Sequence, residues 1–145
     1  MPDYVVVRDI AAPIETAWAL LADVQRWPET TASMTSLTPL DRGPLGEGSR
    51  VVVVQPKLAP ATMVVTLWQP PRRFVWRNQS RLVRMTADHL LETTAAGCRV
   101  TLTMSIAGPL MGLVSLFWSG LIVRYMTMEA EGLKAHAERR HGGAV

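Results

Sequence analysis

A stretch near the start of the chain reads Ala11-Ala-Pro-Ile-Glu-Thr-Ala-Trp-Ala-Leu-Leu-Ala-Asp-Val-Gln-Arg-Trp-Pro28. The valines just before it, Val5 to Val7, are β-branched and predict a strand. Pro13 ends that strand and suits the first turn of a helix, and the alanines and leucines that follow favour a helix. Pro28 is placed to open a second short helix after a break. The stretch therefore predicts one strand followed by two short helices.

Further along, the middle of the chain alternates short apolar runs with turn-forming residues. The runs have the length and the β-branched content of strands, and the turns contain Gly, Pro, Asn or Ser. The five predicted strands are Arg50–Val54, Ala61–Trp68, Arg73–Arg77, Val83–Thr93 and Cys98–Ala107. Connections this short predict an antiparallel sheet.

The last of these strands indicates which face of the sheet is apolar. In it Val100, Leu102 and Met104 alternate with polar residues. A two-residue turn at Ala95-Ala96 places His89 opposite Leu102, on the apolar face. The same register, extended to the earlier strands, predicts an inward-facing set: Val51, Val53, Gln55, Met63, Val65, Leu67, Phe74, Trp76, Asn78, Met85, Ala87, His89 and Leu91.

Several motifs occur in a recognisable order along the chain. They are Pro13, Trp18, Asp23, Trp27 and Pro28, then Gly46-Glu-Gly-Ser49, Pro70-Pro-Arg-Arg-Phe-Val-Trp76, Gly97-Cys-Arg-Val-Thr-Leu102 and Gly132-Leu-Lys-Ala-His-Ala-Glu138. Together they resemble the SRPBCC superfamily, the START and polyketide cyclase/dehydrase-like proteins. The resemblance implies an α+β helix-grip fold: a curved antiparallel β-sheet wrapped around a long C-terminal α-helix, with two short helices after the first strand. It also implies a ligand cavity between sheet and helix.

The composition fits a single domain over residues 1–145. With 48% hydrophobic and 19% charged residues, the chain can bury one sizeable core. Met1–Ile10 lacks a basic segment followed by an apolar run, so we expect no signal peptide and a cytoplasmic location. Cys98 is the one cysteine and is expected to be structural. The chain shows no metal-site spacing and no nucleotide-binding fingerprint, so neither metal nor cofactor is expected.

An apolar inward face with a few polar side chains is typical of a small-molecule cavity. His89 is the candidate catalytic acid or base, because an imidazole titrates near neutral pH. The expected ligand-binding residues are Gln55, Trp76, Asn78, Met85, Met104, Trp118 and Tyr125. Each polar candidate also has a structural interpretation: Gln55 and Asn78 stand at strand ends, where they can satisfy backbone groups, and a histidine can be a satisfied core residue.

The resemblance implies binding of a hydrophobic small molecule and leaves the function open between alternatives. One is a cofactor-free cyclisation or dehydration of a polyketide-type substrate. Another is a non-catalytic carrier of a lipid or other hydrophobic ligand, which needs the same cavity but no proton-transfer group. A third is an interaction module. The fold alone does not choose among them.

A charge-free run extends from Val100 to Val123. Gly108-Pro109 separates its strand part from Leu110–Val123, which is apolar on every side and too short to span a bilayer. We therefore expect a buried helix and no transmembrane segment. Its apolar surface exceeds what one sheet covers, which predicts a cavity mouth, a membrane contact or a weak homodimer.

Arginines concentrate in one predicted hairpin, with no acidic residue among them. They are Arg72, Arg73, Arg77, Arg81 and Arg84. Such a cluster fits either a solvated outer sheet face or a binding site for an acidic carrier protein or a phosphate-bearing ligand. Nucleic acid is not an expected partner, because the net charge is only +3 and no groove-reading motif is present.

Overall fold

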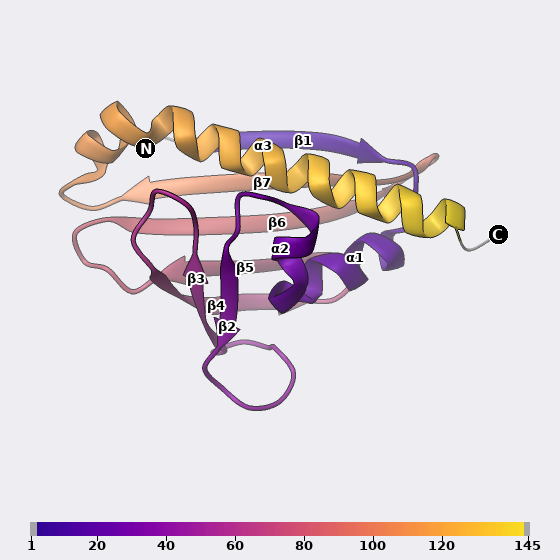
Figure 1. Ribbon diagram of the computed structural model, residues 1–145, viewed down its shortest axis with the longest axis horizontal. Coiled ribbons are helices and arrows are strands. Elements are labelled where there is room, and N and C mark those ends of the chain that lie inside the picture. The colour runs from indigo at the N-terminus through magenta and orange to yellow at the C-terminus, as the bar shows by residue number, and fades with distance from the viewer. Residues whose placement is uncertain (1–2, 144–145) are drawn as a thin grey trace.

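The computed structural model describes residues 3–143 (Figure 1). In chain order its elements are β1 (Asp3–Ile10), α1 (Ile14–Ala22), the 3-10 turn η1 (Val24–Arg26), α2 (Trp27–Thr30), β2 (Ser36–Pro39), β3 (Arg50–Val54), β4 (Ala61–Gln69), β5 (Arg73–Asn78), β6 (Arg84–Thr94), β7 (Gly97–Ala107) and α3 (Met111–Gly143). The predicted strand and two short helices are confirmed. Pro13 stands directly before α1, and Pro28 lies in the first turn of α2, where a fixed φ favours the helix.

The seven strands form one antiparallel sheet in the order β1-β7-β6-β5-β4-β3-β2. The five strands expected in the middle of the chain correspond to β3 to β7. The sequence did not predict β2, because its four residues, Ser36–Pro39, are too few and too polar for a strand pattern. Figure 1 shows that the sheet curves, so that β2 and β3 run across the direction of β6 and β7.

The β6–β7 hairpin has the register expected from the sequence. Thr94 pairs with Gly97 across the turn at Ala95-Ala96, and His89 pairs with Leu102. Both His89 and Leu102 are buried. His89 therefore lies on the same face of the sheet as the apolar side chains of β7.

The predicted alternation fails in β4. A β-bulge lies between Val65 and Leu67, and beyond it Leu67 pairs with Val75 while Trp68 pairs with the buried Phe74. The extra residue reverses the faces of the strand, so Trp68 and not Leu67 turns toward the core. A prediction that assumes strict alternation of the two faces cannot detect an inserted residue of this kind.

The second half of α3 packs along the β1–β7 side of the sheet (Figure 1). The side chains that it buries are Met126, Ala130, Leu133 and Ala137. Two polar contacts fix it to the end of β1: Lys134 Nζ donates to the Asp9 carbonyl (2.7 Å), and the Ala11 N–H donates to Glu138 Oε2 (2.8 Å). This half of the helix completes the core.

The first half of α3 is largely exposed, so the prediction that Leu110–Val123 is a buried helix was wrong. Leu116 is 73% exposed and Phe117 is 68% exposed. The reason is that the curved sheet leaves a cavity, rather than packed side chains, beneath this half, and only one side of the helix faces it. By length and composition α3 could cross a membrane, but its second half is part of the core described above.

Gly132 allows α3 to approach α2 closely. A Cβ atom at this position would lie 2.1 Å from the Thr30 carbonyl oxygen. We expect Gly132→Ala to lower the free energy of unfolding by about 2 kcal/mol, because a backbone carbonyl cannot rotate away from the clash. Gly120→Ala is the matched control in the same helix: nothing lies within 4 Å of its Cβ position, so it should stabilise by about 0.5–1 kcal/mol. Urea denaturation measures both, and equal stabilities would contradict the prediction.

Candidate functional site

A cavity of about 550 Å³ lies between the curved sheet and α3. This volume is typical of small-molecule sites, and most of the lining side chains are apolar. All the site residues predicted from the sequence line it, namely Gln55, Trp76, Asn78, Met85, His89, Met104, Trp118 and Tyr125. The fold thus brings these side chains together, and their roles in binding stay a prediction.

His89 is a buried histidine on the sheet side of this cavity. Its ring stacks on Phe74, with ring centroids 4.1 Å apart, and its Nδ1 lies 3.2 Å from the Phe74 carbonyl oxygen. Because a carbonyl only accepts hydrogen bonds, Nδ1 carries the proton and Nε2 is left with a lone pair. Burial lowers the pKa of His89 to about 4, so the ring is uncharged at neutral pH.

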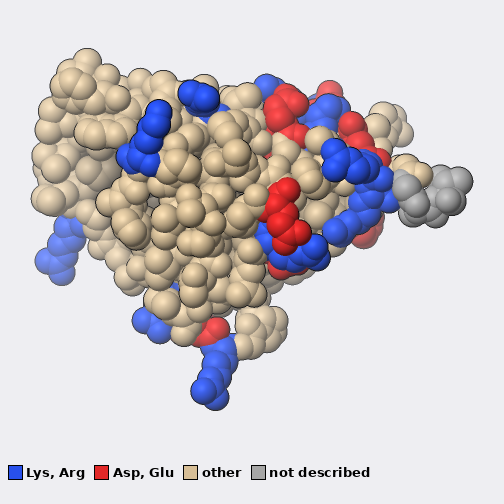
Figure 2. All heavy atoms as spheres, viewed as in Figure 1, with Lys and Arg blue, Asp and Glu red and all other residues tan. Residues whose placement is uncertain are grey.

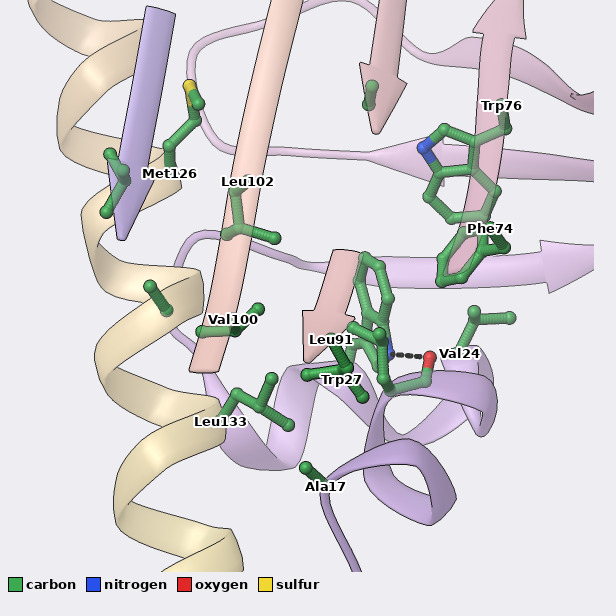
Figure 3. Packing of buried hydrophobic residues seen from close by; sticks show 14 of the residues in the cluster. Ala17, Val24, Trp27, Phe74, Trp76, Leu91, Val100, Leu102, Met126 and Leu133 are labelled. Carbon is green, nitrogen blue, oxygen red and sulfur yellow. Dashed lines mark hydrogen bonds between the residues drawn. The ribbon is translucent and has the colours of Figure 1, made fainter. Parts of the chain in front are cut away.

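Two tryptophans complete an aromatic wall around His89. The ring centroids of Trp27 and Trp76 lie 5.6 Å and 5.7 Å from the imidazole. Trp27 is itself held in place, because its Nε1–H donates to the Leu21 carbonyl (3.0 Å; Figure 3). This wall keeps water from the imidazole, which is the physical cause of the lowered pKa.

Glu129 lines the cavity from α3, although the sequence analysis did not single it out. Glu129 is half-buried rather than sealed from water. The apolar surroundings still raise the pKa of its carboxyl to about 8, and no other residue in 3–143 offsets that effect. The signal that identifies it is helical spacing, because Ile122, Met126, Glu129 and Leu133 recur at intervals of three and four on one face. Glu129 is therefore an uncharged carboxylic acid at neutral pH.

A second, smaller cavity of about 20 Å³ adjoins the same two groups. His89 and Glu129 line both cavities, whereas Thr31 and Leu133 line only the smaller one. Its volume is close to that of one water molecule. At neutral pH the site thus offers a lone pair at His89 and an acidic proton at Glu129, which is the pattern of an acid and a base with separated roles.

Gln55 and Asn78 hold backbone groups at the edge of the cavity. Asn78 Oδ1 accepts from the Met85 N–H (3.1 Å) and Asn78 Nδ2 donates to the Val83 carbonyl (3.0 Å). Gln55 Nε2 donates to the Ser33 carbonyl (3.3 Å). Both amides are thus engaged within the protein, as the structural interpretation of strand-end residues expects.

The cavity opens at the end of the sheet where α3 begins. Its exposed lining residues come from the loops at 59–60 and 79–80 and from Trp118. The Tyr125 hydroxyl donates to the Pro56 carbonyl, which ties α3 to the β3–β4 loop. Trp118 therefore stands at the mouth, whereas His89 lies deep inside.

A sequence model of the family described as polyketide cyclase/dehydrase and lipid transport matches residues 1–138. The chain belongs to this family. The SRPBCC resemblance of its motifs is therefore confirmed, and so is the helix-grip fold. The family's name covers both catalysis and transport, so it agrees with a hydrophobic small molecule as ligand without deciding between those functions.

Solved structures of other proteins share this fold. Protein jhp0584 of Helicobacter pylori has a TM-score of 0.79 at 12% identity, covering 93% of this chain and 86% of its own. TTHA0849 of Thermus thermophilus has a TM-score of 0.77 at 19% identity, covering 94% and 97%. The di-domain ARO/CYC StfQ from the steffimycin biosynthetic pathway has a TM-score of 0.73 at 17% identity, covering 97% and 51%.

A relative found by sequence is the uncharacterized protein Rv2574 of Mycobacterium tuberculosis. It is 29% identical over 108 residues, which is 70% of this chain. The chain spans 64% of the length of that relative.

The raised pKa of Glu129 predicts that stability depends on pH. Between about pH 4.5 and 8 the folded protein keeps a proton that the unfolded chain has lost, so stability falls as pH rises through this window. Glu129→Gln removes the effect. We expect the variant to be more stable than the parent by about 2 kcal/mol near pH 9, a value that allows for screening by water in the open cavity, and equally stable near pH 4.5.

Urea denaturation at the two pH values measures this difference. Glu47→Gln is the matched control, because Glu47 is exposed and lies outside the cavity. A pH-independent difference between the parent and Glu129→Gln would show that the carboxyl titrates normally.

Proposed function

We propose that this protein is a cofactor-free enzyme of the polyketide cyclase/dehydrase type, acting on a hydrophobic poly-carbonyl substrate. The observation that carries the proposal is the pair His89 and Glu129 on the wall of a mostly apolar cavity. At neutral pH both are uncharged, and they offer a base and an acid. Family membership supports the same chemistry.

The proposed reaction is a loss of water that needs only acid–base catalysis. The Nε2 lone pair of His89 takes a proton from a carbon beside a carbonyl group, and the next carbon carries the hydroxyl group that an aldol closure of the chain has formed. Glu129 gives its proton to the hydroxyl group that departs from the neighbouring carbon, and this group leaves as water while a carbon–carbon double bond forms. The imidazolium then returns its proton to the Glu129 carboxylate, so both groups end as they began.

The apolar walls contribute by positioning the substrate. Trp27, Trp76 and the lining methionines leave a shaped space in which a flexible chain adopts few conformations. Holding reacting atoms close together in this way lowers the entropic part of the barrier. Cyclisation by the same site needs only that an enolised carbon meets a carbonyl carbon of the same chain.

Two observations favour carriage of a lipid or another hydrophobic molecule as a second candidate function. The first half of α3 exposes apolar side chains beside the cavity mouth. In addition, a pKa of about 4 makes His89 a weak base. A carrier requires the cavity but neither of the two titratable groups.

Native mass spectrometry combined with a turnover assay tests the proposal. We expect the purified protein to hold a small hydrophobic molecule, and a poly-β-ketone thioester incubated with it to lose one water per molecule converted. If the protein holds a lipid and does not convert such thioesters, the result would contradict the enzyme function and support the carrier function. A protein that binds no hydrophobic molecule at all would contradict both functions.

A further inference from the structure

We propose that the protein docks on membranes containing anionic lipid, through the exposed half of α3 at the cavity mouth. The surface that makes this contact, here called the apolar patch, consists of Leu82, Leu110, Leu113, Leu116, Phe117 and Trp118. The inference goes beyond the proposed function and does not rest on catalysis, because docking needs neither His89 nor Glu129.

The apolar patch is one continuous surface. Leu82 belongs to the β5–β6 loop and lies against the start of α3, where the Leu110 N–H donates to the Leu82 carbonyl (3.0 Å). Leu116 and Phe117 follow Leu113 by three and four residues, which places all three on one side of the helix. Trp118 joins this side to the mouth, since it is exposed and also lines the cavity.

The surroundings of the apolar patch are basic. No acidic residue occurs between Glu47 and Asp88 or between Glu92 and Glu129, and the patch comes entirely from these two segments. The same segments supply exposed cations near this end of the sheet that have no ion-pair partner within residues 3–143: Lys57, Arg77, Arg81, Arg84 and Arg124. In Figure 2 the end where α3 begins shows Lys and Arg side chains but no Asp or Glu. One acidic residue, Asp3 at the start of β1, also lies at this end of the sheet.

Apolar side chains flanked by cations match the surface of an anionic bilayer. Leucine, phenylalanine and tryptophan side chains enter the boundary between headgroups and acyl chains, while guanidinium groups meet the lipid phosphates. A second copy of this chain would instead bring two sets of like charges together, so the charge pattern favours lipid over a homodimer. Docking in this pose holds the cavity mouth against the bilayer, and a hydrophobic ligand passes between them without crossing water.

Flotation with lipid vesicles tests the inference on the purified full chain. We expect the protein to bind vesicles of phosphatidylcholine mixed with phosphatidylglycerol, to bind pure phosphatidylcholine vesicles far more weakly, and to be released by high salt. The double variant Leu116→Ser/Phe117→Ser removes apolar area, and Arg81→Ser/Arg84→Ser removes charge. Each pair should weaken binding by about tenfold or more.

Control variants carry comparable substitutions to serine away from the apolar patch. Val5→Ser/Val7→Ser alters exposed valines of β1, and Arg72→Ser alters an exposed arginine in the β4–β5 turn. Neither should change vesicle binding. Absence of binding to anionic vesicles, or equal binding by all variants, would overturn the inference. So would a dimer in sedimentation that Leu116→Ser/Phe117→Ser dissociates while the parent ignores vesicles.

The docking inference and the proposed enzyme can be refuted independently of each other. The flotation assay uses ligand-free protein, and His89→Gln should bind vesicles like the parent. An active enzyme that ignores vesicles refutes the docking inference alone, and a vesicle-binding protein without turnover refutes the proposed enzyme alone.

Discussion

Trp27→Ala should lower the free energy of unfolding by about 4 kcal/mol, in the range of other buried tryptophans. The side chain is only 6% exposed. Its ring lies 5.4 Å from that of Trp76 and 6.2 Å from that of Phe74, and Figure 3 shows it between α2 and the sheet. Because α2 has only four residues, it has little stability of its own and depends on this contact.

Two further variants separate the parts of this effect. Trp27→Phe keeps most of the apolar contact but removes the indole N–H, so it leaves the Leu21 carbonyl without that donor and should cost about 1–2 kcal/mol. Trp118→Ala is the matched control at the exposed mouth and should cost less than about 1 kcal/mol. Guanidinium denaturation gives all three values. A Trp27→Ala protein as stable as Trp118→Ala would mean that Trp27 does not anchor α2.

His89→Gln should lower turnover of a poly-carbonyl substrate by about 100-fold or more, the usual contribution of a positioned general base. Glutamine retains a donor for the Phe74 carbonyl but has no lone pair of comparable basicity. The ring of His89 also packs on Phe74, so glutamine is preferable to alanine, which would leave a larger hole. Single-turnover kinetics on the thioester measures the effect on the chemical step.

His136→Gln provides the matched control for this substitution. His136 lies on α3, where its Nδ1 contacts the Gly132 carbonyl, and it does not line the cavity. It should retain parental turnover. Thermal unfolding confirms that both variants are folded. Parental turnover in a folded His89→Gln protein would remove His89 from the mechanism.

Local patterns were sufficient to predict six of the seven strands and the placement of His89. The turn at Ala95-Ala96 is short, so the pairing that it sets extends reliably to His89 and Leu102. The bulge in β4 shows where this reasoning stops. Nothing in the residues around Thr66 signals an inserted residue, and Trp68 therefore took the inward place assigned to Leu67.

The cavity itself was the hardest feature to derive from sequence. Helical spacing shows that Glu129 shares a face with Met126 and Leu133, but it does not reveal whether that face meets packed side chains or open space. For the same reason an apolar segment such as Leu110–Val123 was expected to be buried. Which residues are covered depends on the curvature of a sheet assembled from distant strands.

Counting charges along the chain also gave an incomplete picture of which arginines are paired. Arg73 was grouped with the other arginines because no acidic residue stands among them, yet it pairs with Asp88 on the neighbouring strand (2.6 Å). Its partner comes from across the sheet rather than from its own segment. Arg77, Arg81 and Arg84 have no such partner among the residues that the structure describes.

The placement of the five tryptophans gives the protein a built-in optical reporter. Trp18, Trp68, Trp27 and Trp76 are linked through Phe74 into one chain of neighbouring rings, whereas Trp118 stands apart at the mouth. A ligand that quenches indole fluorescence by direct contact meets Trp118 when it arrives and the inner rings when it settles. Stopped-flow fluorescence of the unlabelled protein thus resolves arrival from settling, and Trp118→Phe silences the first signal while leaving the second.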